Sequence, residues 1–111
     1  MLANSSLVQA LAGNLTAARR ALEEGLRGLR EAGDARSVGW ALMQLGRVNL
    51  EHGDLEAAGS RLAQALDAQQ ALGDRWGIVY SLNGLASVAL LSLLFAGIAL
   101  VSLLSEGAGL A

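Results

Sequence analysis

The sequence predicts an all-α fold of antiparallel helical hairpins, and two observations support this prediction. Residues 13–52 and 53–92 align without a gap and are identical at 12 of 40 positions. A fixed period of this length is typical of repeat proteins, in which each repeat is one small unit that packs on the next. The chain of 111 residues also has no Pro, only 4% aromatic residues and abundant Leu and Ala, which favours closely packed helices over a sheet.

Four Gly-Asp or Gly-Asn pairs recur at a constant interval along the chain, and each is expected to end one helix and begin the next. Glycine adopts the left-handed conformation that ends many helices. The Asp or Asn that follows can accept hydrogen bonds from the free backbone amides of the next helix. The pairs are Gly13-Asn14, Gly33-Asp34, Gly53-Asp54 and Gly73-Asp74.

Three helices follow from this spacing, over residues 14–32, 35–51 and 54–72, with neighbouring helices antiparallel. Apolar residues recur three or four positions apart in each, as one buried helix face requires. Residues 2–12 take the place of an earlier helix, but only Leu2, Val8 and Ala10 keep the apolar face. Small residues are expected where helix axes approach closely, and these are Ala18, Gly25, Gly46, Ala58, Ala65 and Ala86.

The last helix is expected to be longer than the others. No Gly-Asp pair follows residue 74, so one helix should run from about Trp76 to about Leu104 and end near Ser105-Glu106-Gly107. Residues 85–104 carry no charge, and this segment satisfies the length and composition of a membrane-spanning helix. Residues 85–92 are also packing positions of the repeat, however. The rest of the segment, residues 93–104, would rise only about 18 Å, which is short of the roughly 30 Å hydrocarbon core.

Three interpretations of the tail therefore stay open. Residues 85–104 insert into a membrane, or the tail results from a truncation or frameshift, or it is a helix buried against the repeats. If its second half is bare, this apolar surface should associate with lipid, with a partner protein or with another copy of the chain.

The residues that support catalysis or metal binding are missing from the sequence. There is no Cys, and the single histidine, His52, has no partners for a metal or catalytic role. Gly-rich phosphate-binding loops and nucleophile motifs are absent. The formal charge of −2 argues against a nucleic-acid-binding face. We expect no enzymatic activity and no cofactor.

The central hairpin resembles the tetratricopeptide repeat (TPR). The matching positions are Leu42, Leu45, Gly46, Gly53-Asp54, Ala58, Leu62 and Ala65. The usual repeat of that family has about 34 residues, whereas the longer form here is similar to repeats in the maltose-activator kind of bacterial transcriptional regulators. The resemblance implies a helical-hairpin solenoid over residues 1–92, with a partial repeat at 2–32, a full repeat at 35–72 and a partial repeat at 75–92. Residues 93–111 form the apolar tail.

The resemblance also implies a function in protein–protein interaction, as part of a larger cytoplasmic signalling or transcriptional regulator. The partner would be a protein or peptide that docks on the concave face, which the first helix of each pair lines. The candidate contact residues are Trp40, Met43, Arg47, Tyr80, Asn83 and Ser87. Because Met43 and Arg47 stand where the family's carboxylate clamp has Lys and Asn, no binding of chaperone-type C-terminal peptides is expected. The alternative is a TPR adaptor held at the cytoplasmic face of a membrane by residues 85–104.

Overall fold

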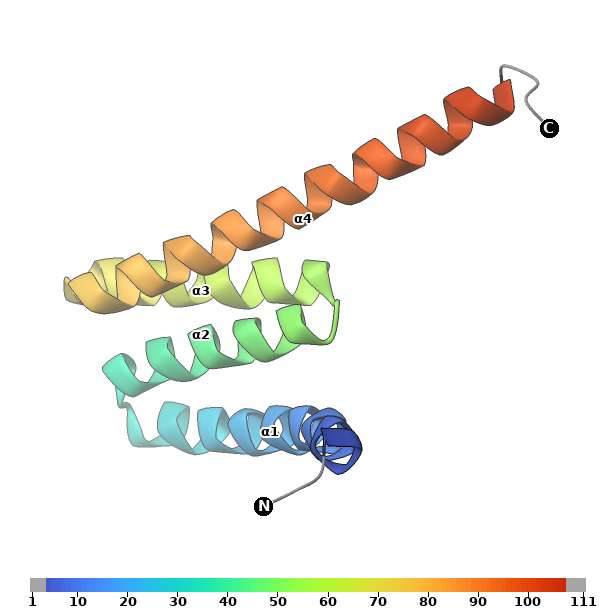
Figure 1. Ribbon diagram of the computed structural model, residues 1–111. Coiled ribbons are helices and arrows are strands. Elements are labelled where there is room, and N and C mark those ends of the chain that lie inside the picture. The colour runs from blue at the N-terminus through green and yellow to red at the C-terminus, as the bar shows by residue number, and fades with distance from the viewer. Residues whose placement is uncertain (1–3, 108–111) are drawn as a thin grey trace.

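The structure is a computed structural model that describes the backbone of residues 4–107 and the side chains of residues 13–107. This part of the chain is entirely helical apart from three short turns, which confirms the predicted all-α class. Figure 1 shows three helices side by side in alternating directions and a fourth that crosses the third and continues beyond it. The helices are α1 (Asn4–Ala32), α2 (Ala35–Glu51), α3 (Leu55–Leu72) and α4 (Arg75–Gly107).

The first of the four expected turns is absent. Helix α1 runs without a break through Gly13 and Asn14, so the prediction that this helix begins at residue 14 is wrong. One glycine costs a helix interior only about 1 kcal/mol, so a Gly-Asn pair does not by itself end a helix. The apolar face expected on residues 2–12 lies outside the described side chains.

The other three Gly-Asp pairs end and begin helices as predicted, and they share one geometry. Each glycine is left-handed, with φ of 72°, 79° and 66° at Gly33, Gly53 and Gly73. The amide of the next residue donates to a carbonyl five positions back, as in a Schellman motif. The Asp34, Asp54 and Asp74 carboxylates then accept from the amides of Ser37, Ala57 and Gly77. The hydrogen bonds from Ser37 hold the pKa of the exposed Asp34 carboxyl below its ordinary value.

The core lies between α1, α2 and α3, and α2 is at its centre. Helix α2 packs against α1 on one side and α3 on the other, and α4 packs on α3 and reaches α2. Leu45 and Leu62 are fully buried, as are the small residues Ala58 and Ala65 that were expected at close contacts. Gly25 and Ala86 differ, because both are exposed, and at Gly25 no atom of a neighbouring helix lies within 4 Å of the position that a Cβ would take.

Leu62 of α3 fills a gap between glycines of two different helices. A Cβ atom built at Gly46 of α2 would lie 2.6 Å from Leu62 Cγ. A Cβ atom built at Gly84 of α4 would lie 2.9 Å from both Leu62 methyl carbons. Neither glycine could carry a side chain without displacing Leu62, so this residue keeps both helices close to α3.

A second contact of this kind lies two turns along α3, at Gln69. Its side chain packs between Gly39 of α2 and Gly77 of α4, which are also two turns from the glycines around Leu62. The Gln69 amide is buried, and in the orientation that satisfies it the nitrogen donates to Gly77 O at 2.7 Å and to Ser81 Oγ at 2.6 Å. These bonds offset the cost of burying the amide.

Helix α4 has 33 residues and falls into two halves. Residues 75–91 pack on α3 through the buried Gly77, Ser81 and Gly84, and Leu91 is the last residue that is half-buried. Residues 92–107 extend past α3, as Figure 1 shows, and all of them are exposed. The predicted long helix and its end near Gly107 are confirmed, whereas residues 93–104 are not buried against the repeats. By length and composition, α4 is a candidate membrane span.

The close approach at Gly46 leads to a stability prediction. Gly46→Ala should lower the free energy of unfolding by about 1–3 kcal/mol, because the new methyl group overlaps Leu62 and approaches Ala58 O. Gly28→Ala is the matched control, since no atom of a neighbouring helix is near its added Cβ, and it should raise helix stability by up to about 1 kcal/mol. Urea denaturation measures both, and equal effects would contradict the contact.

Candidate protein-binding surface

Trp40 and Tyr80 occupy equivalent places in α2 and α4 and contact each other. Each is the sixth residue of its helix, so the two rings stand at the same level above α3. Their centroids are 5.9 Å apart with an interplanar angle of 60°, an edge-to-face arrangement that aromatic pairs prefer. Trp40 is half-buried and Tyr80 is exposed, so each ring keeps an accessible surface.

Asp74 joins this aromatic pair to the turn that starts α4. One carboxylate oxygen accepts from the Gly77 amide at 3.1 Å, and the other accepts from Trp40 Nε1 at 2.7 Å. Arg36 of α2 lies 3.7 Å from the same carboxylate. Asp74 is only 6% exposed, unlike the exposed Asp34 and Asp54 that cap α2 and α3.

A groove runs between α2 and α4 and is lined by most of the predicted contact residues. Its volume is about 340 Å³. The groove is lined by two aromatic rings, the thioether of Met43, the amide of Gln44 and the guanidinium of Arg47, and no acidic side chain lines it. We call this site the aromatic groove, and it is lined by Trp40, Met43, Gln44, Arg47 and Tyr80.

The other three candidate contact residues, Met43, Asn83 and Ser87, are placed differently from Trp40, Arg47 and Tyr80. Met43 is 4% exposed and belongs mainly to the core, so it forms the floor of the aromatic groove rather than a free contact. Asn83 and Ser87 lie further along α4 and do not line the groove. The Ser87 hydroxyl donates to Asn83 O at 3.2 Å, one helical turn back.

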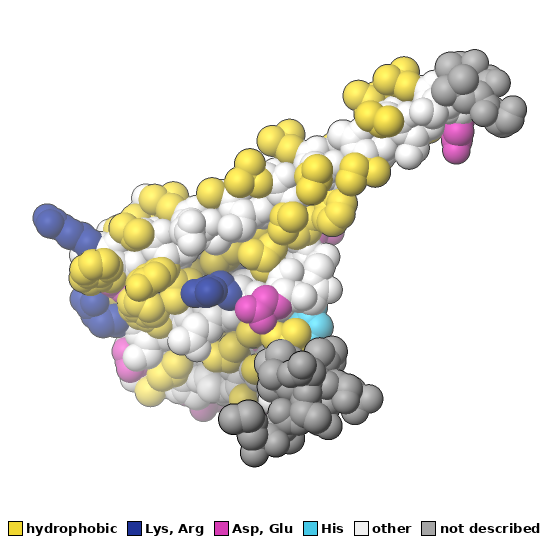
Figure 2. Space-filling view, in the orientation of Figure 1, with side chains coloured by type: hydrophobic (Ala, Val, Ile, Leu, Met, Phe, Trp, Pro, Cys, Tyr) yellow, Lys and Arg dark blue, Asp and Glu magenta, His cyan; other side chains and the backbone are white. Residues whose placement is uncertain are grey.

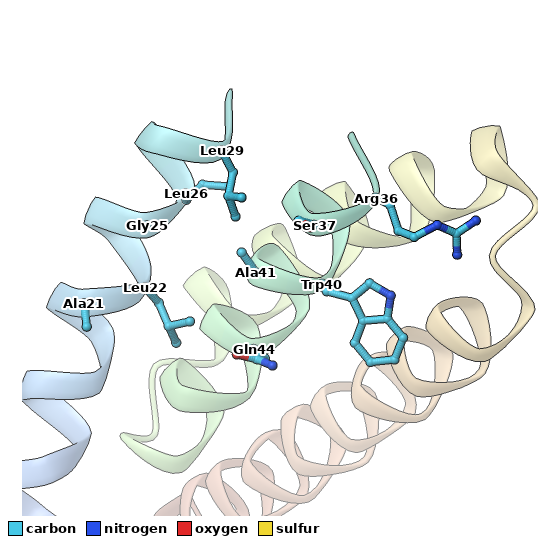
Figure 3. A pocket seen from close by; sticks show the side chains of 10 residues that line it. All are labelled: Ala21, Leu22, Gly25, Leu26, Leu29, Arg36, Ser37, Trp40, Ala41 and Gln44. Carbon is cyan, nitrogen blue, oxygen red and sulfur yellow. The ribbon is translucent and has the colours of Figure 1, made fainter. Parts of the chain in front are cut away.

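A second cavity lies on the other side of Trp40, between α1 and α2, and the sequence did not indicate it. Its volume is about 370 Å³. Figure 3 shows Leu22, Leu26 and Leu29 of α1 on one wall and Ala41 of α2 facing them. Gly25 leaves this space open, because it lacks the side chain that its counterpart Ala65 buries in the core. Trp40 and Gln44 line both openings, so the two form one surface across α2.

Both charged side chains that line this surface are arginines. Arg47 lines the aromatic groove, and Arg36 lines the α1–α2 cavity and lies 3.7 Å from the Asp74 carboxylate, which also accepts from Trp40 and Gly77. The two arginines lie three helical turns apart on α2, which corresponds to about 16 Å along a helix. The arrangement can hold an apolar side chain beside an aromatic face and can pair with a carboxylate.

Within the part of the chain whose side chains are described, no group of three or more His, Cys, Asp or Glu side chains lies close enough together to hold a metal ion. The His52 ring is at the end of α2, where Nδ1 lies 3.0 Å from Val48 O.

Comparisons with models of protein families, with curated proteins and with solved structures found no match. A functional proposal for this chain therefore depends on the geometry of the surface.

Asp74 should contribute more to stability than an ordinary helix cap. Asp54→Ala removes one capping bond and should cost about 1 kcal/mol. Asp74→Ala removes a capping bond of the same length and also the partner of Trp40 Nε1, and should cost about 2–3 kcal/mol. Thermal and urea denaturation compare the two variants. In a Trp76→Phe background, Asp74→Ala should also shift the Trp40 fluorescence, and an unchanged spectrum would contradict the bond.

Proposed function

We propose that this chain is a TPR-type repeat module that binds a protein or peptide partner on the surface formed by α2 and α4. In the family that the sequence resembles, the first helices of successive hairpins line one face and the second helices lie behind them. Helices α2 and α4 contact each other while α3 packs against both, which is the arrangement such a module requires. The proposal assigns no catalytic role, no cofactor and no nucleic acid.

The positions that resemble the repeat family support the hairpin assignment. Ala58, Leu62 and Ala65 are fully buried, and Gly46 packs directly against Leu62. These are the sites at which the family's pattern requires a large apolar residue between small ones. We further propose that the module is part of a larger cytoplasmic bacterial regulator, because the long repeat is similar to those of the maltose-activator kind.

The observation that carries the proposal is the aromatic groove itself. Trp40, Arg47 and Tyr80 come from two helices and meet at one opening, and these residue types dominate the binding energy of many interfaces. The Leu62 and Gln69 contacts fix the backbone that carries these residues, so partner binding would cost little conformational entropy.

Selection of peptides from a random display library on the immobilised full chain tests this proposal. Selected peptides should bind at the aromatic groove, so Tyr80→Ala should weaken their binding by roughly 10-fold or more, as loss of an aromatic anchor does. Trp76→Ala is the matched control, because this ring is 73% exposed and does not line the groove.

Two results would contradict the groove assignment. One is that Tyr80→Ala and Trp76→Ala weaken the selected peptides equally. The other is that no peptide is enriched whose binding depends on Trp40, Arg47 or Tyr80. Circular dichroism of each variant separates a local loss of contact from a loss of fold.

A second candidate is a membrane-anchored adaptor held by residues 85–104. The apolar composition of α4 and the exposure of its second half favour it. Leu85, Val88 and Leu91 would have to leave α3 for this segment to span a bilayer, but all three are only half-buried. The buried Gly77 and Ser81 could stay in place, and the groove would then face the cytoplasm.

Flotation with phosphatidylcholine vesicles tests the anchored form. The full chain should rise with the vesicles, and a chain truncated after Ser92 should stay in the dense fraction, because it lacks most of the exposed apolar segment. A full chain that remains soluble and does not float would exclude the anchor.

A further inference from the structure

The α1–α2 cavity lies where the repeat pattern requires a close helix contact. Helices α1 and α2 correspond to α3 and α4, forty positions later in the sequence. In the later pair, Leu62 is fully buried, and a Cβ atom built at Gly84 would lie 2.9 Å from its methyl carbons. In the earlier pair the corresponding residues are Leu22 and Gln44, which both line the cavity, and Leu22 stays half-buried. The Gln44 side chain occupies the volume that glycine leaves free in the later pair, so α1 packs less closely on α2.

The same difference between the two helix pairs is found two turns away. Gln69 packs against Gly77 in the later pair, whereas Leu29 and Ser37 stand at the corresponding positions and line the cavity. The space between α1 and α2 is about 370 Å³ and is bounded mostly by apolar atoms. Such a space favours an apolar occupant over water.

Trp40 and Gln44 form a ridge between this cavity and the aromatic groove, since both residues line both openings. The ridge follows α2, so a partner chain that lies along it has one opening on each side. An extended chain points successive side chains to opposite sides. Two neighbouring large apolar residues of such a chain can therefore fill the cavity and the groove together.

The charged side chains along the ridge favour an acidic partner. Arg47 lines the groove and forms no ion pair with a carboxylate of the described residues, including Glu51, the only acid in α2. The Arg36 side chain is 61% exposed and lies 3.7 Å from Asp74, so its guanidinium keeps donors for a second carboxylate. Among the described residues, no acid lines either opening. In Figure 2, hydrophobic and basic side chains lie together over the beginning of α4 and below it.

We propose that the partner segment is an acidic peptide that binds in extended conformation along the ridge of α2. One of two neighbouring large apolar residues fills the α1–α2 cavity, and the other fills the aromatic groove. An acidic residue on each side pairs with Arg36 or Arg47, and the roughly 16 Å between these arginines corresponds to about five residues of extended chain. This inference rests on the proposed binding function of the α2 and α4 surface, and it adds α1 to that surface.

Fluorescence anisotropy with synthetic peptides tests the chemistry of the partner. The probe is Asp-Gly-Leu-Phe-Gly-Asp, labelled with fluorescein and amidated at its C-terminus, titrated with the full chain. The same peptide with Lys in place of both Asp should bind at least about tenfold more weakly, because it meets two arginines with like charge. The isomer Asp-Leu-Gly-Phe-Gly-Asp places both apolar side chains on one side and should bind at least about fivefold more weakly.

A matched pair of variants tests the cavity. Gly25→Leu adds a side chain at a position that lines the cavity and has no atom of a neighbouring helix within 4 Å of its added Cβ, so the new side chain fills the space without a clash. It should weaken binding of the acidic peptide at least about tenfold. Gly28→Leu has equal bulk and an equally free Cβ position on α1, but it does not line the cavity, and it should change the dissociation constant less than about twofold. Circular dichroism checks that both variants are folded.

Three outcomes would overturn the inference. If Tyr80→Ala weakens binding of the probe but Gly25→Leu and Gly28→Leu have equal effects, the peptide occupies the aromatic groove alone, and the proposed function stands without this extension. Equal affinity for the acidic and the lysine peptide would exclude an acidic partner. No binding of the acidic peptide at concentrations up to about 1 mM would exclude this class of partner, and the peptides selected from the random library would then decide separately whether the groove binds any other.

Discussion

The insertion of α3 side chains between glycines of α2 and α4 is the contact on which the arrangement depends. Leu62 fits between Gly46 and Gly84, and Gln69 fits between Gly39 and Gly77. Because each side chain touches both helices, the distances of α2 and α4 from α3 are fixed, and so is the position of α2 along its axis relative to α4. This axial alignment brings Trp40 beside Tyr80 and brings the Trp40 indole within hydrogen-bond distance of Asp74. The aromatic groove is therefore a consequence of the packing behind it.

Much of this fold could be predicted because the turns have a local physical cause. A left-handed glycine followed by a capping Asp defines a helix boundary with few distant contacts, and three such pairs predicted α2 and α3 to within a residue. The same local signal failed at Gly13-Asn14, where α1 continues without a break, since a single glycine costs a helix interior only about 1 kcal/mol. The long α4 was predictable for the opposite reason, because no Gly-Asp pair interrupts it.

The contacts that sequence reasoning missed are those that depend on two distant residues at once. Gln69 is a residue type usually found in solvent, yet it is buried because Gly77 and Ser81 satisfy its amide. Asp74 was expected to be an ordinary cap, and its second bond depends on a tryptophan 34 positions earlier. Met43, which the family resemblance placed among the contact residues, lines the aromatic groove but is largely packed in the core. Gly25 opens a cavity where the repeat pattern suggested a close contact.

The central claim is that the Leu62 side chain of α3 touches both Gly46 of α2 and Gly84 of α4. A nuclear Overhauser spectrum of the full chain, observed at the Leu62 methyl protons, measures this most directly. We expect cross-peaks from these methyls to the α protons of both Gly46 and Gly84, because both glycines lie against the end of the Leu62 side chain. Cross-peaks to only one of the two glycines, or to neither, would contradict this packing.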